Sequence, residues 1–355
     1  MCKSEFFIWI ILWVFSILIS TQSFGQDEGA NDFLKRYELA RAEIEKYELT
    51  HGNFIETRNV KMHYLSWGNP ADLPLIWIHG SFTNSYEIKE LAERISKQGY
   101  YLIAIDYYGH GLTPIPSHEV SLYHVADDVI DLMDQKGIEK AVIGGWSRGG
   151  YIASAVYDAY PERVHGLILE DGGSVGTNTF YHALEDEELF DFAGKLFEDR
   201  VEYGRFNSEF ECFKEYVDVT DAGTQFELLA WITQDKDGFW TIGAGLEELF
   251  HISTIDQFVE NIKNSSQVPL FARSMAQMEP LVIFRNLDVP ILILDPVHDV
   301  DIFPFESENE KLKIQHSKLV THRIFENTGH NVHFENPDGF LMEVLGFLKT
   351  IEISK

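Results

Sequence analysis

One serine in this chain lies in a setting that suits a nucleophile. Residues 144–150 read GGWSRGG, after an apolar AVI segment and before a helix-like stretch. We therefore predict that Gly145-x-Ser147-x-Gly149 forms a sharp strand-to-helix turn, where a Cβ at either glycine would collide with a neighbouring element. Such a turn pushes the hydroxyl outward and directs the N–H groups and positive dipole end of the helix at it. Ser147 is the candidate nucleophile.

A serine hydroxyl is a weak nucleophile until a base takes its proton, and the base needs an acid to orient it. The segment IFENTGHNVHFENP, at residues 324–337, supplies two histidines. We predict His330 as the base, because it follows the last expected strand and because Gly329 gives the loop backbone freedom. His333 is the rival base.

Several carboxylates compete for the acid role. The segment ILILDPVHDVDIFP, at residues 291–304, begins as a buried strand and continues as an acidic loop. Asp299 is the predicted acid, because a few residues into the loop a carboxylate can reach back to an imidazole. Asp301 could face the same way, whereas Asp295 lies close to the strand. Asp171, after the preceding strand, is a further candidate.

Acyl chemistry also needs backbone N–H donors for the carbonyl oxygen that becomes negative. The segment LIWIHGSF at residues 75–82 ends a buried strand, and we predict the amides of Ser81 and Arg148 as the oxyanion donors. His79 is expected to hold this loop by hydrogen bonds. The segment AIDYYGHGLT, which contains Asp106, is interpreted as an architectural turn after a strand.

Strand and helix patterns alternate around these residues, which predicts an α/β fold with a mostly parallel sheet and helices on both faces. Residues 26–52 are expected to contain a surface helix, and residues 53–174 and 285–355 to form the core. Residues 175–284 are helical, aromatic-rich and acidic, without clear strands, and are expected to form an inserted cap. Expected strands include residues 60–67, 73–78, 101–106, 141–144, 164–169, 290–294 and 322–325.

In this order the motifs HGSF, DYYGHG, GWSRGG, Asp299 and TGHNVH resemble the landmarks of the α/β-hydrolase family. The resemblance extends from about residue 54 to the end and implies that Ser147, His330 and Asp299 form a catalytic triad. Dehalogenases and epoxide hydrolases of this fold use aspartate at the nucleophile turn, so the serine points to acyl chemistry. Two features depart from the family pattern, namely the DPVHD loop and the charged Arg148 after the serine.

The first 25 residues are predicted to be a signal peptide. Lys3 precedes an apolar run at residues 6–19, and Ser23-Phe24-Gly25 places small residues at the −3 and −1 positions of a cleavage site. The run is short for a membrane span of about 20 residues. We therefore expect export to the periplasm or medium, with no stable membrane insertion after cleavage.

The composition of the chain limits the classes of partner that we expect. The 355 residues are 45% hydrophobic and 14% aromatic, which allows a large core. A formal net charge of −29 would repel a phosphate backbone, so no nucleic-acid partner is expected. Because the chain has no HExxH pattern and His330 and His333 lack a further nearby cluster, no metal or other cofactor is expected.

The aromatic residues of the predicted cap have two interpretations. Most would form the core of a helical lid, while Phe180, Trp231 or Trp240 could line an apolar pocket over Ser147. The side chain of Arg148 could bind a substrate carboxylate, although an internal salt bridge is the simpler expectation.

The function predicted from these residues is an exported serine hydrolase that cleaves a carboxylic ester or a related small acyl compound through an acyl-enzyme. One alternative is an aminopeptidase resembling proline iminopeptidases, in which carboxylates at residues 185–188 would bind a substrate ammonium group. A second alternative is a ligand-binding protein with little turnover.

Overall fold

The computed structural model describes residues 28–197, 203–235, 237–243, 249–298, 301 and 303–353. The predicted signal peptide at residues 1–25 lies outside the described residues. No helix within the described ranges is both long and apolar enough to cross a membrane.

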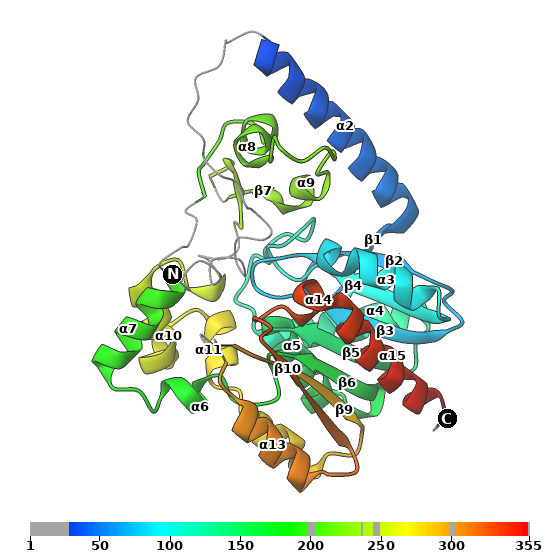
Figure 1. The fold of residues 1–355 in the computed structure, drawn as a ribbon, viewed down its shortest axis with the longest axis vertical. Helices are drawn as coiled ribbons and strands as arrows, with labels where there is room; N and C mark the ends of the chain where they lie inside the picture. Colours follow the sequence, from blue (N-terminus) through cyan, green and yellow to red (C-terminus); the bar gives the residue numbers. More distant parts are fainter. Residues whose placement is uncertain are drawn as a thin grey trace.

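An eight-stranded sheet forms the centre of the protein (Figure 1). β1 and β2 at one edge are antiparallel to their neighbours, and the other strands run parallel. Because the central strands are buried on both faces, they read as continuous apolar runs, and every residue of LPLIWI except the proline and every residue of AVIGGW is buried. In spatial order the strands are β1 (Gly52–Glu56), β2 (Lys61–Trp67), β4 (Tyr100–Ile105), β3 (Leu73–Ile78), β5 (Ala141–Trp146), β6 (Val164–Glu170), β9 (Ile291–Val297) and β10 (Val320–Glu326).

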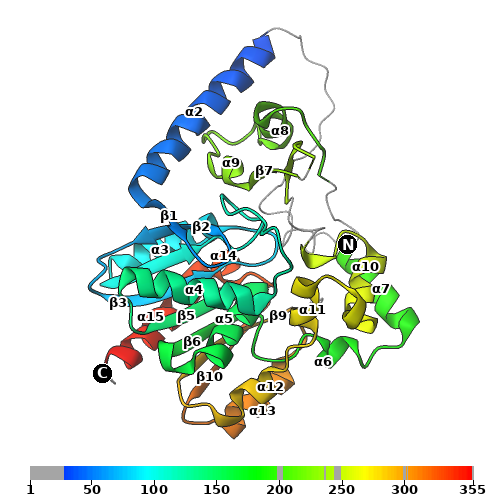
Figure 2. The same cartoon turned by 180° about the vertical axis from the view of Figure 1, so that it is seen from behind.

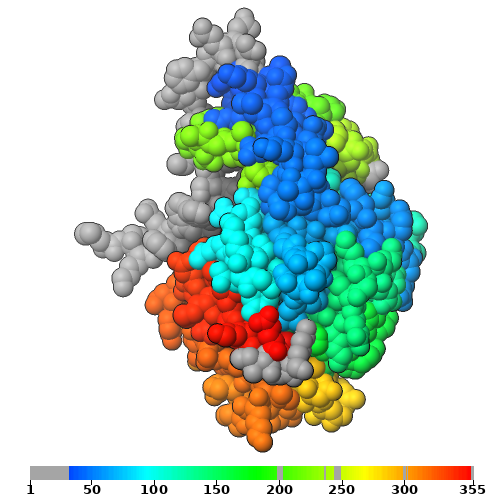
Figure 3. All heavy atoms as spheres, turned by 90° about the vertical axis from the view of Figure 1, so that its right-hand side faces the viewer, coloured from blue at the N-terminus to red at the C-terminus, as the bar shows by residue number. Residues whose placement is uncertain are grey.

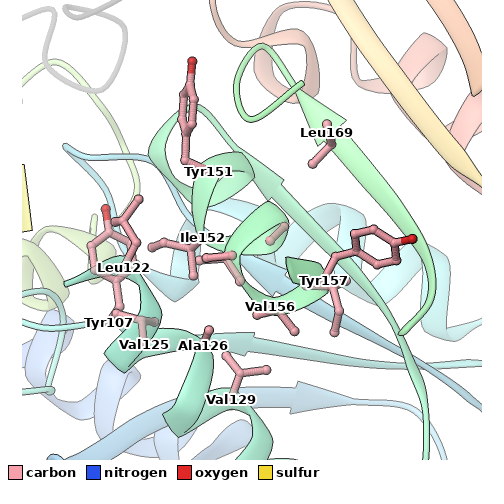
Figure 4. Packing of buried hydrophobic residues seen from close by; sticks show 14 of the residues in the cluster. Tyr107, Leu122, Val125, Ala126, Val129, Tyr151, Ile152, Val156, Tyr157 and Leu169 are labelled. Carbon is pink, nitrogen blue, oxygen red and sulfur yellow. The ribbon is translucent and has the colours of Figure 1, made fainter. Parts of the chain in front are cut away.

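Helices cover both faces of this sheet, as the alternation of patterns predicts. α4 (Leu122–Lys136) and α5 (Arg148–Ala159) lie over the face turned to the viewer in Figure 2. α3 (Lys89–Ser96) and α15 (Pro337–Ile353) cover the opposite face. Apolar side chains of α4 and α5 interdigitate, as Figure 4 shows for Leu122, Val125, Ile152 and Val156. These contacts fix the position of α5 and therefore of the turn that precedes it.

The segment between β6 and β9 is helical, as expected, but it also contains a small hairpin that the sequence reading missed. β7 (Ile232–Gln234) pairs with β8 (Trp240–Ile242) in antiparallel register. The hairpin groups with α8 (Glu209–Tyr216) and α9 (Glu227–Trp231), and we call this group the upper lobe (Figure 1). The lower lobe consists of α6 (Asn178–Tyr181), α7 (Asp186–Phe197), α10 (Ile255–Lys263) and α11 (Leu270–Ala276). Along the chain, α12 (Pro280–Ile283) follows the lower lobe and precedes β9, and α13 (Glu306–Gln315) connects β9 to β10.

The predicted N-terminal helix is α2 (Glu28–His51), and it connects the upper lobe to the core (Figures 1 and 3). Arg36 donates through Nη1 to the carbonyl oxygens of Asp218 and Asp221 in the upper lobe, at 2.9 Å each. At the other end of the helix, Glu48 contacts Tyr86 and His63 of the core. α2 therefore links two parts of the chain that are far apart in sequence.

Candidate active site

Ser147 occupies the sharp turn that the sequence predicts. β5 ends at Trp146 and α5 begins at Arg148, and between them Ser147 has φ 52° and ψ −120°. A non-glycine residue at positive φ is strained and is held only by its surroundings. The Ser147 amide donates to the carbonyl oxygen of Glu170 at 2.8 Å. A Cβ at Gly149 would lie 1.9 Å from the carbonyl oxygen of Ile78, so only glycine permits this close approach.

His330 lies on the loop after β10, and its ring nitrogen Nδ1 contacts the carboxylate of Asp171. Asp171 follows β6 directly and also has a positive φ, 44°. The next residue, Gly172, packs on the nucleophile, because a Cβ there would lie 2.2 Å from the Ser147 carbonyl oxygen. On the other side, Trp146 Nε1 donates to the His330 carbonyl oxygen at 2.7 Å. The backbone around Ser147 is thus bonded or packed directly against both loops that carry the His330–Asp171 pair.

The candidate acids have different positions. Asp299 lies outside the described residues, so its choice as the acid stays a prediction. Asp295 is buried within β9 and contacts His322 Nε2 at 2.6 Å, which fits the expectation that it lies too close to the strand. Asp301 accepts from the amide of Phe303 at 2.9 Å. Among the described carboxylates, only Asp171, the outside candidate of the sequence reading, is hydrogen-bonded to the His330 ring.

Burial dominates the electrostatics of this pair. It lowers the pKa of His330 to about 4, against the opposing pull of Glu170 and Asp301. The imidazole is therefore neutral at pH 7, the form that can accept a proton. Burial also raises the pKa of Asp171, and the neighbouring charge of Asp301 adds to the effect. With Nδ1 bonded to Asp171, Nε2 is the ring nitrogen that remains for a hydroxyl proton.

The rival base, His333, lies behind the site. Its side chain is fully buried, and Nδ1 contacts Glu170 Oε1 at 2.8 Å. The amide of His333 donates to the same oxygen at 2.9 Å. This double contact ties the start of α14 (Val332–Glu335) to the end of β6. His333 therefore fixes the backbone that follows His330.

The predicted oxyanion loop is held by three side chains. Tyr107 donates through its hydroxyl to the Gly80 carbonyl oxygen at 3.0 Å, and His79 Nδ1 contacts the same oxygen at 2.7 Å. The Gly80 C=O and the Ser81 N–H belong to one trans peptide and point in opposite directions, so these contacts set the direction of the Ser81 N–H. His110 Nε2 contacts the Ser81 carbonyl oxygen at 2.9 Å.

The second predicted donor is the amide of Arg148, the first residue of α5. An N–H in the first turn of a helix has no carbonyl partner within that helix. The side chain of Arg148 reaches the other donor loop, because Nε donates to Ser81 Oγ at 2.8 Å. Tyr107 and His110 both lie in the DYYGHG motif, but the sequence predicts no individual role for either side chain. His79 has the loop-holding role expected of it.

The upper lobe and the core loops enclose a cleft beside Ser81. It is lined by the loops at residues 81–84 and 109–111 and, from the upper lobe, by Trp231 and Ile242, among others. Of the three aromatic residues proposed to line a pocket, only Trp231 lies in this cleft. Phe180 packs against Tyr181 and Phe192, whereas Trp240 packs within the upper lobe.

The described part of the chain contains no group of three or more histidine, cysteine, aspartate or glutamate residues that could hold a metal ion. The arrangement described above consists of a hydroxyl at a strained turn, a neutral imidazole oriented by a carboxylate, and a fixed backbone amide. Together these groups can move a proton and stabilise a developing oxyanion.

The sequence matches the family model of the α/β-hydrolase fold over residues 74–202. It is 26% identical over 290 residues to the putative 2-succinyl-6-hydroxy-2,4-cyclohexadiene-1-carboxylate synthase of Bacillus subtilis strain 168, a match that covers 80% of this chain and 93% of that protein. Epoxide hydrolase 1 of Caenorhabditis elegans is 28% identical over 121 residues, which cover 32% of this chain and only 29% of that relative.

Among solved structures, a membrane phospholipase A described as a bacterial virulence factor superposes with a TM-score of 0.61 at 18% identity. The superposition covers 91% of this chain and 94% of that chain. At this level of identity the likeness concerns the fold. The eight-stranded sheet, the family-model match over residues 74–202 and these structural similarities show that the chain has the α/β-hydrolase fold.

Proposed function

We propose that this protein is a serine hydrolase that cleaves carboxylic esters of small acyl compounds through an acyl-enzyme on Ser147. The observation that carries the proposal is the contact between the His330 imidazole and Asp171, on two loops that pack against the strained backbone of Ser147. Serine hydrolases need this combination of nucleophile, base and orienting acid.

In the proposed reaction the Ser147 hydroxyl oxygen attacks the ester carbonyl carbon, and its proton passes to His330 Nε2. The carbonyl oxygen becomes negative and is stabilised by the amides of Ser81 and Arg148. The C–O bond to the alcohol then breaks, and the alcohol leaves with the proton from His330. A water molecule then gives a proton to His330 Nε2 and attacks the acyl carbon. The bond to Ser147 Oγ breaks, Oγ takes the proton back from His330, and the carboxylic acid leaves.

We assign the orienting role to Asp171 because it is the described carboxylate that bonds His330 Nδ1. Asp299, the choice from sequence, is the alternative that mutation can test. Part of the chain matches epoxide hydrolase 1 of Caenorhabditis elegans. Epoxide hydrolases of the α/β-hydrolase family carry an aspartate at the nucleophile turn, whereas this chain has Ser147, so the proposal does not include epoxide hydrolysis.

Labelling with a fluorophosphonate tests the proposal directly. We expect covalent modification of Ser147, mapped by peptide mass spectrometry, and hydrolysis of p-nitrophenyl esters. Ser147→Ala should abolish labelling and lower kcat by about 10⁴- to 10⁶-fold, with an unchanged thermal transition. Ser154, buried and bonded to the Gly173 carbonyl oxygen, provides a control, because Ser154→Ala should stay labelled at Ser147. Retention of most esterase activity in Ser147→Ala would refute the assignment.

The aminopeptidase alternative finds little support in the cap. The carboxylates at residues 185–188 are exposed, and Asp186 pairs with Lys263 at 3.1 Å on the protein surface. A proline arylamide would test this alternative beside the ester. Tight ligand binding without product release would instead favour a binding protein.

We further propose that the protein acts outside the cytoplasm, on the evidence of the sequence at residues 1–25. The acidic composition supports the absence of a nucleic-acid partner. N-terminal sequencing of the protein recovered from the producing cells tests export, since cleavage before Gln26 is the expected result.

A further inference from the structure

Arg148 carries a buried charge that no described carboxylate neutralises. The residue is 5% exposed, and none of the salt bridges among the described residues includes it. Nε donates to Ser81 Oγ, but Nη1 is buried without a hydrogen-bond partner. The internal salt bridge expected from sequence is therefore absent from the described part of the chain. An unpaired buried charge costs several kcal/mol, so its presence calls for an explanation.

Aromatic rings offset only part of that cost. The guanidinium carbon lies 4.0 Å from the ring centroid of Phe250 and 5.8 Å from that of Phe271. Such cation–π contacts are favourable but much weaker than a buried ion pair. They satisfy the face of the guanidinium but leave the in-plane N–H donors of Nη1 without an acceptor. The two rings come from the segment before α10 and from α11, so the charge is enclosed between the core and the inserted cap.

The charge also lies next to the predicted reaction centre. Arg148 directly follows the nucleophile, and its Nε holds the side chain of the opposite oxyanion residue, Ser81. Burial lowers the pKa of Arg148 to about 10, so the guanidinium is still protonated at neutral pH. The whole chain has a net charge of −29, and an anionic substrate would meet a repulsive long-range field. The buried guanidinium of Arg148 is a local positive charge that would counteract this repulsion inside the site.

We propose that the Nη1 side of Arg148 binds a carboxylate of the substrate, so that the enzyme prefers esters with a carboxylate close to the scissile carbonyl. This inference rests on the proposed function, because it specifies the substrate of the Ser147 reaction. Monoesters of short dicarboxylic acids are the substrate class. We expect a 10- to 100-fold preference over a neutral ester, equivalent to about 1.4–2.7 kcal/mol, which lies in the range of a hydrogen bond to a charged group.

The test compares two esters with the same four-carbon acyl chain, mono-p-nitrophenyl succinate, which ends in a carboxylate, and p-nitrophenyl butyrate, which ends in a methyl group. In the natural protein we expect kcat/KM to be at least tenfold higher for the anionic ester, mainly through KM, because the ion pair forms already in the bound ground state. Arg148→Gln should lower this ratio by 10- to 100-fold. Both esters will also lose whatever the contact with Ser81 contributes, and the ratio removes that common loss.

Ser81→Ala is the matched control. It removes the acceptor of Arg148 Nε but keeps the guanidinium and the backbone amide of Ser81, so the rates with both esters should fall together and the ratio should persist. A ratio near one in the natural protein, or an equal change of the ratio in both variants, would show that Arg148 only positions Ser81 and would overturn the inference.

Inhibition by anions identifies the chemistry of the ligand. Free succinate should compete with the neutral ester more strongly than succinamide, and this difference should vanish in Arg148→Gln. Stronger inhibition by inorganic phosphate than by succinate would point to a phosphate group and contradict the carboxylate. Fluorophosphonate labelling of Ser147 separates the two levels of failure. A labelled, active enzyme without a charge preference refutes only the inference, whereas an unlabelled, inactive protein refutes the proposed function.

Discussion

Two of the histidine–aspartate pairs in the structure differ in the contacts of their second ring nitrogen. His63 in β2 contacts Asp106, directly after β4, through Nδ1 at 2.6 Å, and contacts Glu48 of α2 through Nε2 at 3.0 Å. His330 contacts Asp171 through Nδ1, and no described residue forms a hydrogen bond with its Nε2. Both ring nitrogens of His63 contact carboxylates, whereas Nε2 of His330 is available to a reacting group.

The electrostatics follow this difference. Burial alone would lower the pKa of His63, but the hydrogen bonds and charges of Asp106 and Glu48 outweigh it and raise this pKa to about 9. At His330 burial dominates, and the pKa falls to about 4. At pH 7 the first imidazole is a cation that joins α2 to the core, and the second is neutral. A buried pair of histidine and aspartate is therefore not by itself a catalytic signature.

Exchange of the acid is expected to give the largest effect. Asp171→Asn keeps the shape and tolerates the positive φ of this position, but a carboxamide cannot hold the imidazole in the same tautomer and charge state. We expect kcat to fall by about 10³- to 10⁴-fold with little change in KM. The measurement is steady-state hydrolysis of a p-nitrophenyl ester.

Asp299→Asn is the matched variant, and its loss should stay below about tenfold if Asp171 is the acid. The reverse order of the two losses would restore the choice made from sequence. Asp106→Asn extends the comparison to the other pair, and it should lower stability rather than kcat.

The choice of the acid shows which residues of the candidate site can be located from sequence patterns and which cannot. Ser147 and His330 are predicted from local signals, since glycines and strand ends are visible in the chain. The acid depends on which strand end lies beside the imidazole, and Asp171, the acid that we propose, is 159 positions from His330. One local signal does exist, because Asp171 precedes two glycines in EDGGS, much as Ser147 is flanked by glycines in GGWSRGG.

The fold shows a similar division. The buried strand at residues 73–78 is predicted with its observed bounds, because a continuous apolar run bounded by turns indicates a central parallel strand. The hairpin of β7 and β8 is missed because each strand has three residues and depends on packing within the upper lobe. That no described carboxylate pairs with Arg148 also cannot be predicted from sequence, because it depends on which residues surround the guanidinium in the folded protein.

The pair at His63 predicts a pH dependence of stability. The pKa of His63 in the folded protein, about 9, lies above its ordinary value of 6.5. The contribution of protonated His63 to the unfolding free energy is therefore complete below pH 6.5 and is lost as the pH rises through 9. A shift of this size corresponds to about 3 kcal/mol of unfolding free energy. We expect this decrease in urea unfolding measured from pH 6 to pH 9.5.

His63→Gln supplies the control for this measurement. The variant should be less stable at pH 6 but should lack the part of the decrease that belongs to His63. The burial of His330 acts in the opposite direction, and its contribution is lost as the pH falls from 6.5 towards 4. Equal slopes for the natural protein and His63→Gln above pH 6.5 would contradict a protonated His63.

The smallest expected effect concerns the link between the two regions. Asp106 belongs to the His63 pair, and the next residue, Tyr107, donates to the Gly80 carbonyl oxygen of the oxyanion loop. Tyr107→Phe removes one hydrogen bond that orients the Ser81 amide but leaves the second contact from His79. We expect kcat to fall about three- to tenfold, equivalent to roughly 1 kcal/mol, with KM nearly constant.

Tyr108→Phe is the matched control for Tyr107→Phe, because the Tyr108 hydroxyl donates to Asp128 at 2.5 Å within the core, whereas the Tyr107 hydroxyl donates to the Gly80 carbonyl oxygen. Loss of that bond should lower the unfolding free energy without changing kcat. If both variants lowered kcat equally, the effect of Tyr107 would reflect general loosening of the core rather than the direction of one peptide. If only Tyr107→Phe lowers kcat, the segment that contains Asp106 of the His63 pair also orients the proposed oxyanion donor, the Ser81 amide.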